Sequence, residues 1–198
     1  LFNLQFNYSN YLKIFLANHI VYQSQFSKDC HQSIFPNKNS TIINNSTPWK
    51  FNNLPLIKYK NAKGEQSKSI LICTSFHRDR PLKGFGDLLI QCETIKNKFK
   101  SLDLKLLIFG YVERSHVKTY SKIVLDIDKY LDKNRDWITT YPRFSNYSKE
   151  LSTKLLAADA YITYAQQDPC PNIVLEVLSH GLPIIGCNSG GVPEIIRN

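Results

Sequence analysis

Short, continuously apolar runs alternate with segments of helical periodicity in the last two-thirds of this chain. Three such runs are SILICTS (Ser69 to Ser75), LKLLIFG (Leu104 to Gly110) and AYITYA (Ala160 to Ala165). Strands that are buried on both faces of a sheet are apolar throughout, whereas half-exposed strands alternate apolar and polar residues. The pattern therefore predicts an α/β fold, with a Rossmann-like parallel sheet covered by helices on both faces.

The segments between these runs complete the alternation. DLLIQCETIKNKF has helical spacing, and its predicted core face consists of Leu88, Leu89, Cys92 and Ile95. We expect further helices at KTYSKIVLDIDKYL, YSKELSTKLLAAD, Pro171 to His180 and after GGVP, with strands around Trp137 to Thr140 and at LPIIGC. Upstream, IVYQS, QFSKDCHQSIF and STIINN predict a strand, a helix and a strand, as in the end of a preceding α/β domain. An Asn- and Lys-rich stretch places the boundary near Lys60 to Ser67.

Composition narrows the class of protein. None of the 198 residues is methionine, so we expect this chain to be an internal part of a longer protein. It shows no secretory signal pattern and no apolar run of membrane-spanning length. The five cysteines are scattered without zinc-ligand spacing, which predicts free thiols, a cytoplasmic location and no metal site.

The net charge of +9 favours anionic partners: phosphorylated small molecules, nucleic acid or an anionic membrane surface, where the protein would be peripheral. A merely solvated Lys-rich surface explains the charge equally well. No RGG, zinc-finger or RNP-like pattern accompanies it, so only the charge supports a nucleic-acid binder and we do not expect that partner.

One loop at the carboxyl edge of the predicted sheet is basic. TSFHRDRPLKGFGDLL places Arg78, Arg80 and Lys83 just before a helix. Cations beside the N–H groups of a helix start form a site for phosphate oxygens. The alternative is a flexible basic loop eased by Gly84 and Gly86, and KGFG matches no Walker or dinucleotide motif.

A second stretch, QQDPCPNIVLEVLSHGLPIIGCNSGGVPEII, carries two acids and glycine-bearing turns. Pro171 suits the first turn of a helix that ends at Gly181 in a left-handed cap. The helical wheel assigns Ile173, Val174, Val177 and Leu178 to the core and turns Glu176 away from it, toward Asn172.

Each polar feature of that stretch has an ordinary explanation. Glu176 suits a solvated helix position, Asp168 suits the turn before Pro169, and Glu194 suits the positive end of its own helix. Together, however, these features collect acids, glycine turns and exposed helix N–H groups at one sheet edge. We therefore favour a binding site there.

This stretch resembles the C-terminal half of a GT-B fold glycosyltransferase of the group 1 (GT4-type) family. RDRPLKGF is similar to the family's Arg-x4-Lys-Gly segment, and YSKELSTKLLAADAYITYA is similar to its helix and strand before the acidic loop. VYQSQFSKDC and TIINN resemble the end of its N-terminal domain. The resemblance implies that residues 1–60 are the tail of the acceptor-side domain and the linker. Residues 61–198 would be a truncated nucleotide-sugar-binding domain.

The resemblance also implies roles for individual residues. Arg78 and Lys83 match the pair that neutralises the diphosphate leaving group, and Glu176 matches a glutamate that binds the ribose hydroxyls. Asp168 stands where the family has a glutamate that contacts the hydroxyls of the transferred sugar. The side chain at this position is therefore one methylene shorter in this chain. Asp168 thus joins Arg78 and Lys83 as a catalytic candidate. The remaining donor-binding candidates are the backbone at Asn172, Ile173 and Val174, and the Gly190-Gly191 turn.

The function implied is transfer of a sugar from a nucleotide-diphosphate donor to a carbohydrate or lipid-linked acceptor, in glycan or lipopolysaccharide-type synthesis. No cofactor or metal is expected beyond the donor itself, and this part alone is expected to be inactive. The alternative is a non-catalytic GT-B-like module that binds a nucleotide or a partner, which the Asp at position 168 motivates.

Overall fold

The apolar runs of the sequence form the strands of a parallel sheet in the computed structural model of this chain. The structure describes residues 8–46, 69–75, 84–101, 103–110, 127–142 and 147–197. The main sheet has five strands in the order β5-β4-β3-β6-β7, and every pair is parallel. Its strands are β3 (Ser69–Ser75), β4 (Asp103–Phe109), β5 (Ile138–Tyr141), β6 (Ala160–Thr163) and β7 (Ile184–Gly186).

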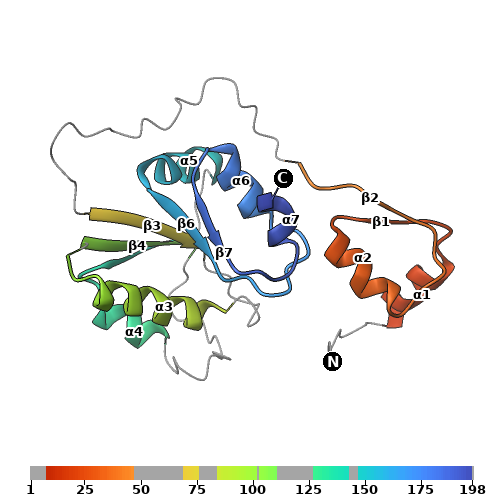
Figure 1. The fold of residues 1–198 in the computed structure, drawn as a ribbon, viewed down its shortest axis with the longest axis horizontal. Coiled ribbons are helices and arrows are strands. Elements are labelled where there is room, and N and C mark those ends of the chain that lie inside the picture. The colour runs from red at the N-terminus through yellow and green to blue at the C-terminus, as the bar shows by residue number, and fades with distance from the viewer. Residues whose placement is uncertain are drawn as a thin grey trace.

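Helices cover both faces of the main sheet, as predicted (Figure 1). They are α3 (Phe85–Lys98), α4 (Ile127–Lys133), α5 (Tyr147–Ala157), α6 (Asn172–Ser179) and α7 (Val192–Arg197). Neighbouring residues of one strand point to opposite faces, so Leu106 packs with α3 and α4 while Leu107 packs with α5 and α6. This division explains why neighbouring positions of the central strands are mostly apolar, whereas the edge strands β5 and β7 keep exposed positions.

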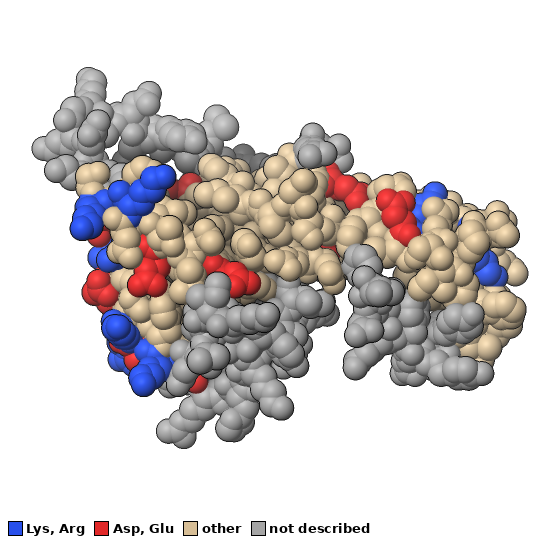
Figure 2. Space-filling view, turned by 60° about the horizontal axis from the view of Figure 1, so that its bottom comes forward, with Lys and Arg blue, Asp and Glu red and all other residues tan. Residues whose placement is uncertain are grey.

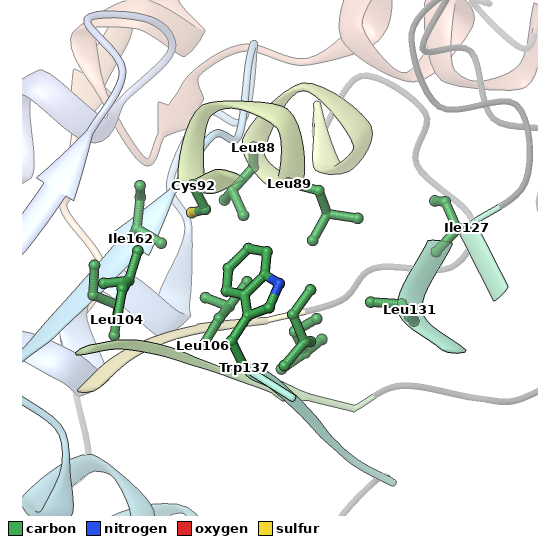
Figure 3. Close-up of a cluster of buried hydrophobic side chains, with 12 residues drawn as sticks. Leu88, Leu89, Cys92, Leu104, Leu106, Ile127, Leu131, Trp137 and Ile162 are labelled. Carbon is green, nitrogen blue, oxygen red and sulfur yellow. The ribbon is translucent and has the colours of Figure 1, made fainter. Parts of the chain in front are cut away.

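Trp137 lies at the centre of the core on the α3 and α4 face (Figure 3). Its side chain is only 3% exposed, and Leu88, Leu89 and Cys92 from α3 lie above it. The indole Nε1–H donates to Asn134 Oδ1 over 3.1 Å, so the buried ring keeps its polar atom paired.

Several predicted details need correction. Ile95 was expected in the core, but it is 37% exposed because α3 turns that position past the edge of the packed face. On α6, Val174 and Val177 are buried as predicted, whereas Ile173 and Leu178 are only half-buried. Pro171 stands at the N-cap of α6, just before the first turn. Gly181 has the left-handed conformation predicted for it, with φ of 67°.

A smaller group of elements precedes the main sheet, and we call residues 8–46 the N-terminal unit. It contains α1 (Tyr8–Leu16), β1 (Ile20–Tyr22), α2 (Gln25–Gln32) and β2 (Ser40–Ile42). The two strands pair in parallel, as expected for an α/β unit, but the sequence analysis had not predicted α1. The expected domain boundary near residues 60–67 lies outside the described residues and stays a prediction.

On the face drawn in Figure 2, Lys and Arg side chains gather at the end of the main sheet that is remote from the N-terminal unit. They are interspersed there with Asp and Glu, so the described cations of this face do not form a patch of one sign. No described helix is both long and apolar enough to cross a membrane.

Candidate functional site

The carboxyl ends of β3, β4, β6 and β7 lie at one edge of the main sheet because these strands are parallel. Gly84, at the N-cap of α3, lies against Tyr164, which follows β6. A Cβ atom at Gly84 would overlap the Tyr164 ring, so the start of α3 is fixed beside the end of β6. Lys83 directly precedes Gly84 in the sequence, but Arg78 and Lys83 themselves lie outside the described residues.

The loop after β6 and the turn after β7 are held together by their backbones. The Gly191 N–H donates to the Asp168 carbonyl oxygen over 2.8 Å. A Cβ atom at Gly190 would come within 2.5 Å of that same oxygen, and one at Gly191 would overlap the Pro169 carbonyl. Only glycines allow this approach, so the backbone of the Gly190-Gly191 turn packs directly against that of the Asp168 loop.

The side chain of Asp168 supports its own turn. Its Oδ1 accepts a hydrogen bond from the Cys170 N–H over 3.3 Å, which is the local bond expected of an aspartate before Pro169. The preceding residue, Gln167, has φ of 58°, a left-handed backbone conformation that residues other than glycine rarely adopt. Such strained backbone is concentrated at functional sites, and here it turns the chain into the loop.

The start of α6 points its N–H groups at the same edge. Pro171 at the N-cap has no side-chain oxygen to accept them, in contrast to the Ser, Thr or Asp that usually stands there. Val174 N bonds back to the Pro171 carbonyl oxygen over 2.9 Å, and the Val174 side chain is wholly buried. Ile173 and Val174 thus hold the helix in place by packing, and the Val174 N–H is already paired within the first turn.

Glu176 lies one turn beyond Asn172 on the face of α6 that turns away from the core. Both residues line a cavity of about 460 Å³, together with Leu175 and the chain from Ile43 to Ser46. A volume of this size is in the range of small-molecule sites. Asp168 lines neither this cavity nor the smaller hollow beside it, which has Cys170 and Gly191 in its wall.

The linker side of that cavity was missed by the sequence analysis. Asn45 Nδ2 donates to Asn172 Oδ1 over 2.9 Å, across 127 positions of the sequence. No local pattern in STIINN indicates this pairing, because the partner belongs to a different element. The sequence analysis placed the Asn44-Asn45 pair inside the predicted strand STIINN, whereas β2 ends at Ile42 and leaves both residues beyond it.

Cys170 lies between the Asp168 loop, the chain around Asn45 and helix α7. The side chain is buried, and that burial raises the pKa of its thiol. A hydrogen bond with the Asn45 backbone lowers the same pKa, and the negative charges of Asp168 and Glu194 raise it. Both acids therefore act electrostatically on one buried thiol. No group of three or more His, Cys, Asp and Glu that could hold a metal occurs within the described part of the chain.

The structure thus brings Asn172 and Glu176 together on one cavity, with the Asp168 loop and the Gly190-Gly191 turn locked beside it. Ile173 and Val174 line neither cavity. The roles assigned to these residues and to Arg78 and Lys83 stay predictions.

Comparison with known proteins bears on this arrangement. The family described as "Glycosyl transferases group 1" matches residues 67–198. An uncharacterized glycosyltransferase of Haemophilus influenzae is 27% identical over 189 residues, which cover 95% of this chain and 47% of the relative. The chain therefore spans about half the length of that curated relative.

Solved structures share the fold at low sequence identity. Sucrose-phosphate synthase from Thermosynechococcus elongatus gives a TM-score of 0.68 at 16% identity, over 95% of this chain and 46% of that one. The pneumococcal O-GlcNAc transferase GtfA, solved with UDP and GlcNAc, gives 0.63 at 15% identity, over 96% and 34%. The lipopolysaccharide outer core galactosyltransferase WaaB gives 0.61 at 15% identity, over 93% and 47%.

Proposed function

The chain belongs to the group 1 family of glycosyl transferases, and from that premise we propose that it binds the nucleotide diphosphate of a sugar donor at the carboxyl edge of its main sheet. The observation that carries the proposal is the cavity of about 460 Å³ that Asn172 and Glu176 line at the start of α6. It combines a carboxylate with the positive end of a helix, which are the groups that ribose hydroxyls and phosphates require.

The position proposed for the donor follows from the charges of its phosphates and of the protein groups around them. The diphosphate lies against the first N–H groups of α6, with Lys83 and Arg78 supplying positive charge from the loop after β3. The ribose hydroxyls donate to the Glu176 carboxylate, one helical turn further on. Asp168 is assigned to the hydroxyls of the transferred sugar, although its short side chain also bonds to Cys170 N.

Sugar transfer breaks the bond between the anomeric carbon and a phosphate oxygen, and negative charge grows on the diphosphate as that bond opens. Cations and helix N–H groups fixed in advance around the diphosphate lower the energy of this transition state. In this proposal the present chain stabilises the leaving group, and the acceptor binds opposite it. A carbohydrate or lipid-linked acceptor, in glycan or lipopolysaccharide-type synthesis, is the corresponding expectation.

Calorimetry with a nucleoside and with the corresponding nucleoside diphosphate tests these roles. We expect UDP, GDP or ADP to bind the chain, and we would try UDP first because the pneumococcal relative was solved with it. Glu176→Gln should weaken binding of nucleoside and nucleoside diphosphate alike, by about tenfold, since a hydrogen bond to a charged group contributes about 1.5–3 kcal/mol. Lys83→Ala should weaken only the diphosphate.

Glu150→Gln provides the matched control, because Glu150 is an acid in the first turn of another helix, α5. It should leave both affinities unchanged. The assigned roles would be contradicted if Lys83→Ala weakened nucleoside binding as much as diphosphate binding. They would also be contradicted if Glu176→Gln left nucleoside binding unchanged. Failure of all three diphosphates to bind would overturn the proposed function.

A second candidate is a non-catalytic module that binds a nucleotide or a partner without transfer. The bond from Cys170 N to Asp168 favours it, because a carboxylate engaged in its own turn is a poor sugar ligand. Sugar transfer or donor hydrolysis by a protein that contains this chain decides between the two. Either activity excludes the module, and binding without activity supports it.

A further inference from the structure

Glu194 in the first turn of α7 contacts the N-terminus of α2 in the N-terminal unit. Its Oε2 accepts the Gln25 N–H over 2.8 Å, and its Oε1 accepts the Phe26 N–H over 2.7 Å. These partners are 169 and 168 positions away in the sequence. Figure 1 shows α7 and α2 facing each other across the two groups of elements.

With Glu194 in place, the start of α2 is fully paired. Ser24 Oγ accepts the Ser27 N–H over 3.1 Å, and the Ser24 carbonyl accepts the Lys28 N–H over 3.1 Å. Among the described residues, the carboxylate of Glu194 is the group that accepts the first two N–H groups of the helix. A negative charge at the positive end of a helix is also favourable.

A second bridge lies close by. Asn45 bonds to Asn172, and between the two bridges is a hollow of about 180 Å³. Ser24 and Asn45 line it from one side, and Cys170, Gly191 and Glu194 line it from the other. The N-terminal unit is therefore held at two points beside the proposed donor cavity, whose own outer wall is the chain from Ile43 to Ser46.

We propose that Glu194 is a positioning residue that latches the N-terminal unit to the main-sheet domain and thereby sets the width of the cavity between residues 43–46 and α6. The carboxylate spans both first-turn amides of α2, so its loss frees that helix end. The linker wall can then move away from Glu176. The effect on nucleotide binding rests on the proposed function, whereas the latch itself does not.

Hydrogen exchange of the backbone amides tests the latch in the 198-residue chain. Glu194→Ala should speed exchange at Gln25 and Phe26 by about tenfold, a loss comparable to that of a helix cap. Glu194→Gln keeps the shape and one acceptor oxygen, so it should give a smaller increase. Unchanged exchange in α2 would show that Glu194 serves only its own helix, and would overturn the latch.

Two controls keep this result interpretable. Glu150→Ala removes a first-turn acid from α5 and should leave α2 exchange unchanged. Slow exchange in β4, whose Ile108 is wholly buried, reports that the variant is folded. If Glu194→Ala loses that protection, Glu194→Gln alone decides the outcome.

Titration with UDP tests the second half of the proposal. We expect Glu194→Gln to weaken UDP binding about fivefold, because apparent affinity falls with the fraction of molecules in the competent arrangement. Equal affinity, together with faster α2 exchange, would overturn the claim about cavity width. If UDP binds neither protein, GDP and ADP are tested in its place; failure of all three overturns the proposed function, and the exchange result still decides the latch.

Discussion

Gly191 is the residue at which the two loops of the candidate site come closest. Its N–H donates to the Asp168 carbonyl oxygen, and the Pro169 carbonyl occupies the space that a side chain would need. The neighbouring Gly190 adds a left-handed backbone with φ of 65°. The pair is therefore required by space and conformation together, whatever the site binds.

Gly191→Ala should destabilise the fold by about 1–3 kcal/mol, because the new methyl group pushes the Pro169 backbone away. Urea unfolding followed by circular dichroism measures the loss. Gly181→Ala is the matched control, since Gly181 is left-handed with φ of 67° but exposed, and its loss should stay near 1 kcal/mol. A smaller loss for Gly191→Ala than for Gly181→Ala would contradict the crowding argument.

At the scale of elements, a buried pair joins α5 to the end of α6. The His180 Nδ1–H donates to the Glu176 carbonyl oxygen over 2.7 Å, and Nε2 is hydrogen-bonded to the Ser152 hydroxyl over 2.8 Å. The His180 side chain is 5% exposed. This pair fixes the last turn of the helix that carries Glu176.

Ser152→Ala should cost about 1–3 kcal/mol in unfolding free energy, because it removes the hydroxyl that is hydrogen-bonded to a buried ring nitrogen. The same change made in a His180→Ala background should cost much less, and this double-mutant cycle isolates the bond. Thr153→Ala, at an exposed neighbouring position, should stay within about 0.5 kcal/mol. Equal costs for Ser152→Ala and Thr153→Ala would disprove the role of the bond.

The central strands of the main sheet could be predicted from sequence because they are largely buried on both faces. The run LKLLIFG has a single charged position, Lys105, and Gly181 marks a helix end because glycine readily takes the left-handed conformation found there. Ile95 was misplaced because helical spacing defines a face but not how far the neighbouring sheet extends. The helix α1 was missed although its sequence, YSNYLKIFL, has apolar residues at helical spacing: Tyr8, Tyr11, Leu12 and Phe15.

The site was predictable only where its residues are close in sequence. Asn172 and Glu176 are one helical turn apart, so the helical wheel placed them on one face. Glu194 stands in the first turn of its own helix, as predicted, but its carboxylate also contacts the start of α2, which was not predicted. That pairing depends on how two distant units meet, and no periodicity within either unit contains the information.

At the scale of the whole molecule, two buried thiols make stability depend on alkaline pH. Burial raises the pKa of Cys73 from 9.0 to about 12 and that of Cys92 to about 11. In the unfolded chain both thiols ionise near pH 9, while in the folded chain they keep their protons. The folded state therefore binds more protons above pH 9, and raising the pH lowers its stability.

We expect the unfolding free energy to be insensitive to these thiols below pH 8 and to fall between pH 9 and about pH 11. Each thiol contributes a slope of about 1.4 kcal/mol per pH unit. Cys73→Ala should remove one such contribution, as measured by urea unfolding at pH 8, 9, 10 and 11. Cys30→Ala, at a half-buried position in the N-terminal unit, should change the slope less. The idea fails if both variants retain the wild-type slope.

The central position of β3 determines the order in which this protein can fold. β3 pairs with β4 on one side and with β6 on the other. Just before β6, the Asp159 carboxylate accepts the Leu71 N–H across 88 positions of the sequence. Contacts between distant segments form late, because a long loop must close first. A nascent β3-α3-β4 unit therefore presents an open, apolar strand edge until β6 arrives, and association between chains competes with folding during that interval.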